Sequence, residues 1–142
     1  MFEVKLVQNE EDRGRAFDVR MKVFVEEQGI PQHLEIDEHD QTSIHFIVNN
    51  GDQTIAASRL REIAPKVGKV ERVCVLESSR GKRLGALIME AVEKYAVENN
   101  WEMLKLHAQN YAVPFYEKLG YVVTSPEFMD AGIPHRAMEK QI

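Results

Sequence analysis

The sequence predicts one mixed, twisted α/β sheet with helices on both faces, organised as a single domain over residues 1–142. Three observations predict this fold class. Strand-like and helix-like segments alternate along the chain. The early strand candidates follow one another through short turns, which favours antiparallel pairing, and two later candidates enclose a helix, which is typical of a parallel crossover. We therefore expect a largely antiparallel sheet of six to seven strands flanked by about four helices.

The first strand and the first helix follow clear periodic patterns. Phe2, Val4 and Leu6 alternate with charged residues, which predicts a half-buried strand. Asn9 is a candidate N-cap for a helix that opens with three acidic residues. Residues 26–41 mix glycine, proline and acids, so we expect a loop or a short second helix there. The buried stripe of the first helix would consist of Ala16, Val19, Val23 and Phe24.

The middle of the chain predicts a meander of three strands. Residues 44–48 and 54–60 are strand candidates joined through Asn50-Gly51, a pair that favours a hairpin turn. A third strand, residues 69–76, is expected after a turn at residues 65–68.

The second half predicts alternating helices and strands. Apolar residues at helical spacing over residues 80–98 indicate the most regular helix, with Ser79 available as its cap. The remaining predicted elements are a strand at 101–107, a helix at 113–119, a strand at 121–124, a loop at 125–135 and a strand at 136–139.

Composition excludes several function classes. A net charge of -5 argues against binding to a nucleic-acid backbone, which needs a concentrated basic surface. Cys74 is the single cysteine, so an internal disulfide is impossible and no Cys/His cluster suggests a metal site. No run of eighteen apolar residues occurs, so membrane spanning is not expected. A cytoplasmic protein without a metal fits these features.

One segment, VERVCVLESSRGKRLGALIMEA, combines a β-branched strand, a short turn and an amphipathic helix. Free amides and the dipole at a helix start can bind a pyrophosphate without a metal. Gly81 and Gly85 would allow close approach, and Arg80, Lys82 and Arg83 add positive charge. A solvated basic helix end would look similar. The P-loop and dinucleotide-binding glycine patterns are both absent.

Two motifs give the chain a family resemblance. The run Arg80-Gly81-Lys82-Arg83-Leu84-Gly85-Ala86 resembles the GNAT signature [QR]-x-x-G-x-[GA], whose loop holds the pyrophosphate of coenzyme A, with Arg83 where glycine is usual. Residues 109–121, QNYAVPFYEKLGY, resemble the superfamily's N-x-x-A-x-x-F-Y-x-K-x-G-F, with Gln109 at the usual asparagine. With RMKVFVEEQGIP and AGIPHRAM, they make nearly the whole chain similar to the small bacterial ElaA- or YjcF-like GNAT N-acetyltransferases.

The resemblance implies the ligands and much of the site. Acetyl-CoA would be the cosubstrate, with its pantetheine arm between splayed strands at residues 70–76 and 101–107, and an amine would attack it directly in a ternary complex. Backbone amides near Val73 to Val75 would stabilise the oxyanion. The implied cofactor-binding residues are Val73, Cys74, Val75, Arg80, Gly81, Lys82, Arg83, Leu84, Gly85, Ala86, Gln109, Ala112, Phe115 and Tyr116.

The sequence indicates the catalytic residues less clearly than the cofactor-binding residues. Tyr116 matches the family's general acid, although an aromatic packing role is the alternative. Glu71 on the cofactor strand, His107 at the end of its partner and His135 in the late loop are the candidate general bases. Cys74 is better interpreted as a small buried residue than as a nucleophile that carries the acetyl group.

Several alternatives stay open at this level. A coenzyme A-binding sensor without turnover is the runner-up, and the VFVEEQGIP segment also resembles acyl-homoserine lactone synthases. The acceptor, the acyl group and the choice between monomer and homodimer are not determined. Residues 26–45 are expected on the acceptor side, where acids could recruit a cationic amine or form a solvated loop. These acids are Glu26, Glu27, Glu35, Asp37, Glu38 and Asp40.

Overall fold

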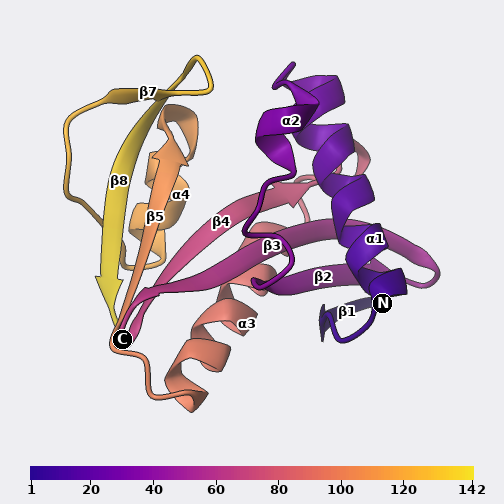
Figure 1. The fold of residues 1–142 in the computed structure, drawn as a ribbon, viewed down its shortest axis with the longest axis horizontal. Coiled ribbons are helices and arrows are strands. Elements are labelled where there is room, and N and C mark those ends of the chain that lie inside the picture. The colour runs from indigo at the N-terminus through magenta and orange to yellow at the C-terminus, as the bar shows by residue number, and fades with distance from the viewer.

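The computed structural model describes residues 1–142 and has one eight-stranded sheet with the strand order β1-β2-β3-β4-β5-β8-β6, in which β7 also pairs with β8 (Figure 1). The strands are β1 (Phe2–Leu6), β2 (Ile44–Asn50), β3 (Gln53–Ala64), β4 (Val67–Val75), β5 (Met103–Gln109), β6 (Val122–Val123), β7 (Phe128–Asp130) and β8 (Ile133–Gln141). The α-helices are α1 (Glu10–Arg20), α2 (Gln32–Glu35), α3 (Leu84–Glu98) and α4 (Val113–Lys118). A π-helix, η1 (Met21–Glu27), and two short 3-10 helices, η2 (Glu77–Ser79) and η3 (Asn110–Ala112), complete the fold.

The predicted fold class is confirmed. All strand pairs are antiparallel except β4 with β5, which the crossover helix α3 connects. The predicted number of strands was too low, because β7 lies within the expected loop at residues 125–135. Helices α1 and α3 pack on the same central strands from opposite sides, and α4 lies against β5 (Figure 1).

The first helix begins as its sequence predicts. The side chain of Asn9 accepts a hydrogen bond from the Asp12 amide at 2.8 Å, which satisfies one free donor of the first turn. The helix does not end at Arg20 but continues directly as the π-helix η1, so Val23 and Phe24 remain on its buried side. All four residues of the predicted stripe are buried.

The turn between β3 and β4 is tighter than predicted. Ala64 pairs with Val67, which leaves Pro65 and Lys66 alone in the turn. Gly68 lies within β4, where the ring of Trp101 covers its Cα so closely that a Cβ would overlap the ring. This glycine is therefore required by packing rather than by a turn.

The central strands β4 and β5 separate halfway along their length. They pair in parallel only from Val67 to Val70 and from Met103 to Leu106. Beyond these residues β5 pairs only with β8, and Figure 1 shows the carboxyl ends of β4 and β5 diverging. The expected splay is thus present, and the fold positions a site between the two strands.

No helix of the chain is both long enough and apolar enough to cross a membrane.

Candidate active site

A cleft of about 860 Å³ occupies the space between the separated strands. One wall is formed by β4 and the other by β5, while η1 and α4 contribute further lining residues. All four residues considered for acid-base chemistry line this cleft, namely Glu71, His107, Tyr116 and His135. The fold therefore brings together groups that are distant in the sequence.

A β-bulge shapes the β4 wall. Cys74 pairs with Ala57 and Glu71 pairs with Arg59, so two residues of β4, Arg72 and Val73, lie opposite Ser58 alone. Arg72 has a left-handed φ of 58°. Bulges bend a strand and increase its twist. We attribute the departure of β4 from β5 to this bulge, which the regular alternation of ERVCV in the sequence does not reveal.

The bulge determines which backbone amides face the cleft. The Leu76 amide donates to the carbonyl of Ile55 in the β3 direction at 2.9 Å. Because amide directions alternate along an antiparallel strand, the Cys74 amide also faces β3, whereas those of Val73 and Val75 face the cleft. Val73 and Val75 are thus the available donors in the predicted amide group, and Cys74 is not.

The turn before α3 leaves a row of free amides. The backbone amides of residues 81–86 have no hydrogen-bond acceptor, and the first amide of this region with one is that of Leu87, which donates to Arg83 at 3.1 Å. Gly81 and Arg83 have left-handed φ values of 83° and 59°. Such a row at a helix start is an anion-binding concavity.

Two sequence-based details of this turn were wrong. The helix begins at Leu84 rather than Arg80, and Ser79 belongs to η2 instead of capping α3. The left-handed residues interrupt the helical conformation until Arg83. Arg83 adopts a left-handed φ, which glycine, the residue of the GNAT signature at this position, adopts without steric cost.

Arg80 holds the turn in place. Its Nη1 and Nη2 each donate to one carboxylate oxygen of Glu27 at 2.7 Å, and its Nε donates to the carbonyl of Val75 at 3.1 Å. The hydrogen bonds from Arg80 lower the pKa of Glu27. Because these contacts occupy the guanidinium, Lys82 and Arg83 are the exposed cations of this turn without an acidic partner.

The predicted cofactor-binding residues divide between the two parts of the site. Gly81, Lys82, Arg83, Leu84 and Ala86 lie in the free-amide turn or the first turn of α3, outside the cleft lining. The others line the cleft: Val73, Cys74, Val75, Arg80, Gly85, Gln109, Ala112, Phe115 and Tyr116. The side-chain amides of Gln109 and Gln28 exchange hydrogen bonds of 2.9 and 3.3 Å, which joins β5 to the residue that follows η1.

Tyr116 lies at the base of the cleft. Its ring is 8% exposed and packs edge-on against Phe115 and Tyr121, with centroid distances of 4.9 and 5.9 Å. Burial raises the pKa of Tyr116, so the phenol remains protonated at neutral pH. A protonated phenol is the form that a general acid requires.

Two histidines lie on either side of Phe128 at the cleft edge. The ring of His107 is edge-on to Phe128 at 5.0 Å, and that of His135 is stacked on it at 6.0 Å. His135 Nδ1 is 2.7 Å from the carbonyl of Ile133 and must donate to it, which leaves Nε2 as the acceptor in the neutral ring. Desolvation and the nearby Lys69 charge lower the pKa of His107.

Glu71 and Cys74 have environments that disfavour catalysis. Burial opposes ionisation of Glu71, but the hydrogen bond from Arg61 and the charges of Arg59 and Lys69 outweigh it and lower its pKa to about 2. A carboxylate this weakly basic is a poor general base. Burial raises the pKa of the Cys74 thiol to about 12, so it is not a nucleophile at neutral pH.

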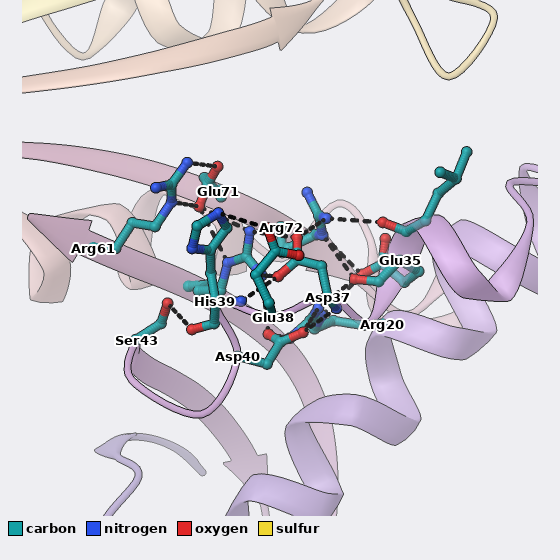
Figure 2. Close-up of polar contacts among 12 residues, drawn as sticks. Arg20, Glu35, Asp37, Glu38, His39, Asp40, Ser43, Arg61, Glu71 and Arg72 are labelled. Atoms are coloured by element: carbon teal, nitrogen blue, oxygen red, sulfur yellow. Dashed lines mark hydrogen bonds and ion pairs between the residues drawn. The ribbon is translucent and has the colours of Figure 1, made fainter. Parts of the chain in front are cut away.

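A buried ion-pair network lies beneath the β4 wall (Figure 2). Arg20, which is 0% exposed, binds Glu35 at 2.8 Å and Asp40 at 2.7 Å. Arg59 contacts Asp37 at 2.7 Å and also shares Asp40. The three carboxylates come from the acidic segment at residues 26–45, so they neutralise buried arginines. They form neither a solvated loop nor a free surface for a cationic acceptor.

Comparisons with known proteins agree with this architecture. The family model described as an acetyltransferase (GNAT) domain matches residues 8–142. The uncharacterised N-acetyltransferase YjcF of Bacillus subtilis is 46% identical over 136 residues, covering 95% of this chain and 96% of YjcF.

Solved structures share the fold along the whole chain. A crystal structure of a proposed N-acetyltransferase from Lactobacillus plantarum has a TM-score of 0.93 and 30% identity. The match covers 99% of this chain and 97% of the Lactobacillus chain. Escherichia coli ElaA has a TM-score of 0.88 and 23% identity, covering 99% of this chain and 99% of ElaA.

The separated strands and the free-amide turn define a coenzyme A-dependent acyltransferase architecture. The chain belongs to the GNAT acetyltransferase family, and its sequence is similar to that of YjcF over nearly its whole length.

Proposed function

We propose that this protein transfers an acetyl group from acetyl-CoA to a primary amine by direct attack within a ternary complex. One observation carries the proposal: the Val73 and Val75 amides face the same cleft that Tyr116 and His135 line. These groups would supply backbone donors, an acid and a base around one space.

The free-amide turn at residues 81–86 would bind the diphosphate of coenzyme A. Its amides lack acceptors, the dipole of α3 favours negative charge, and Lys82 and Arg83 add exposed positive charge. The pantetheine arm would then lie along β4, in the position that a paired strand would otherwise occupy. The amides of Val73 and Val75 would donate to its amide carbonyls or to the thioester oxygen.

The proposed chemistry uses one base and one acid. The acceptor amine must lose a proton to become nucleophilic, and Nε2 of His135 is available to take it, directly or through water. As the new C–N bond forms, the cleft-facing amides stabilise the oxyanion. The C–S bond then breaks, Tyr116 donates its phenolic proton to the departing thiolate, and the second proton of the acylated nitrogen returns to the phenolate directly or through solvent.

A release assay tests the proposed activity. Acetyl-CoA and a panel of primary amines are incubated with the protein, and free thiol and acetylated amine are measured. We expect both products in equal amounts and a marked loss of turnover in His135→Asn. Tight coenzyme A binding without amine-dependent thiol release would instead favour the sensor. Release with longer acyl donors and S-adenosylmethionine would favour a homoserine lactone synthase.

The sensor alternative loses one of its supports. Arg83 in place of the usual glycine would favour a sensor if it disrupted the turn, but Arg83 has a left-handed φ of 59°, which glycine adopts readily, and the amides on either side remain free. The substitution therefore leaves the backbone of the diphosphate turn intact. The depressed pKa of Glu71 does not support the sensor either, because His135 offers another base.

A further inference from the structure

The cleft between β4 and β5 offers few free negative charges. Among its carboxylates, Glu27 is paired with Arg80, Glu35 with Arg20, and Glu71 with three cations. Asp130 of β7 is the remaining carboxylate in the lining and has no ion-pair partner. An acceptor with several positive charges would therefore find only one unpaired acid.

The buried ion-pair network beneath the β4 wall contains more cations than carboxylates. Its cations outnumber its carboxylates by one, so the network has a net charge of +1 although each cation contacts at least one carboxylate. The cations are Arg20, Arg59, Arg61, Lys69 and Arg72, and the carboxylates are Glu35, Asp37, Asp40 and Glu71.

Of the two cations of this network that line the cleft, Lys69 and Arg72, Arg72 is the one that several contacts hold in a fixed position. Its Nε contacts both the carbonyl and the carboxylate of Glu35 at 3.2 Å, and its Nη2 contacts the carbonyl of Leu34 and the carboxylate of Asp37 at 3.1 Å. No protein group accepts from Nη1, and this nitrogen is not among the enclosed polar atoms without partners. Figure 2 shows it directed away from the network.

The fixed position of Arg72 suits it to binding an anion. Four contacts and the left-handed bulge hold the guanidinium, so little side-chain entropy remains to be lost when a ligand binds. The side chain is 22% exposed and lines the cleft beside the apolar Ile30 and Leu34. A guanidinium in such surroundings forms strong charge-assisted hydrogen bonds with carboxylates.

We propose that the acceptor is a small amine that also carries a carboxylate, and that Nη1 of Arg72 binds this carboxylate. The inference rests on the transferase proposed above. Asp130 and His135, on the β7 and β8 side of the cleft, suit the amine end, while Arg72 on the β4 side suits the acid end. The apolar residues between them suit a hydrocarbon side chain.

Product analogues test the inference without requiring turnover. N-acetyl-L-leucine and N-acetyl-L-leucinamide differ in the carboxylate alone, and each is titrated calorimetrically into protein saturated with coenzyme A. We expect the acid to bind at least about tenfold more tightly than the amide, as a charge-assisted hydrogen bond predicts. Equal affinity, a preference for the amide, or no binding of either compound would overturn the inference.

Two variants assign the preference to Arg72. Arg72→Gln should bind both compounds equally, and Arg72→Lys, which retains the charge but not the fork of donors, should retain part of the preference. Arg61→Gln is the matched control, because Arg61 belongs to the same network but does not line the cleft. Coenzyme A affinity and thermal unfolding confirm that each variant is folded. A full preference for the acid in Arg72→Gln would overturn the assignment.

Turnover separates this inference from the proposed function. Acetylation of leucinamide but not leucine would leave the transferase standing and refute the carboxylate site. Preferential binding of N-acetyl-L-leucine, without thiol release from acetyl-CoA in the presence of any amine, would support the carboxylate site and refute the transferase.

Discussion

Gly85 faces the ring of Phe115 so closely that a Cβ on Gly85 would lie 3.1 Å from the ring's Cζ. This contact fixes the distance between the first turn of α3, which carries the free amides, and α4, which carries Tyr116. The diphosphate turn and the proposed acid are therefore linked through one small residue.

Gly85→Ala should weaken coenzyme A binding by roughly tenfold, because Phe115 must move and is itself packed against Tyr116. Calorimetry with coenzyme A measures the effect. Gly14→Ala is the matched control: Gly14 lies in α1 with no atom within 4 Å of the added Cβ, so the better helix former should stabilise the protein by about 0.5–1 kcal/mol. Unchanged affinity in Gly85→Ala would show that α4 is not held in this way.

Tyr116→Phe should lower kcat by about a hundredfold or more, as expected for loss of a general acid, and leave the affinity for acetyl-CoA unchanged. Tyr121→Phe is the control, since Tyr121 belongs to the same aromatic cluster but does not line the cleft. Steady-state thiol release and calorimetry give the two quantities. Equal turnover in Tyr116→Phe and wild type would assign Tyr116 to packing.

Arg83→Gly should raise the free energy of unfolding by up to about 1 kcal/mol, because glycine removes the left-handed strain at this position while adding chain entropy. Urea unfolding measures the change. Arg83→Ala retains the strain and removes the charge, so it should lower coenzyme A affinity without stabilising the fold. A lower stability of Arg83→Gly than of Arg83→Ala would contradict this explanation of the turn.

The buried network predicts a particular acid sensitivity. Burial opposes ionisation of Asp40, but hydrogen bonds from Arg20 and the Asp37 amide outweigh it and place the pKa of Asp40 far below its ordinary value. A depressed pKa stabilises the fold above the unfolded value, about 3.9, and this stability is lost as the pH falls through the folded value. Wild-type unfolding free energy should thus decline steeply below about pH 4.

Asp40→Asn should reduce that slope, to which Glu71 and Asp37 also contribute, and should cost about 3 kcal/mol or more at pH 7, because Arg20 and Arg59 lose a buried partner. Urea unfolding at a series of pH values measures both effects. Glu38→Gln, whose side chain is 83% exposed, should match wild type throughout. An identical acid slope in wild type and Asp40→Asn would show that other carboxylates govern the acid response.

Local patterns were sufficient to predict most of the fold. Alternation identified β1, and the Asn9 cap with its apolar stripe identified α1, because both signals depend on neighbours in sequence. The three-residue strand β7 was missed because it is too short to show a period and exists only through pairing with β8. The late start of α3 was missed because Arg83, in the free-amide turn, has a left-handed φ that an arginine in the sequence does not predict.

Residues of the candidate site could be predicted from the sequence only where a family motif includes them. The motif positions at Gly85 and Tyr116 do lie around one cleft. The bulge at Arg72 and the partners of Arg20 were not predictable, because they depend on pairing across segments far apart in the chain. Four acids of residues 26–45 are paired with arginines, which the sequence could not show; they are Glu27, Glu35, Asp37 and Asp40.

The account depends most on the free amides of residues 81–86. The most direct measurement is a pair of calorimetric titrations, one with coenzyme A and one with pantetheine, which lacks the nucleotide and its diphosphate. We predict that coenzyme A binds and that pantetheine binds at least about a hundredfold more weakly, because the amide row has no anion to hold. No uptake of coenzyme A, or equal affinity for the two compounds, would contradict the account.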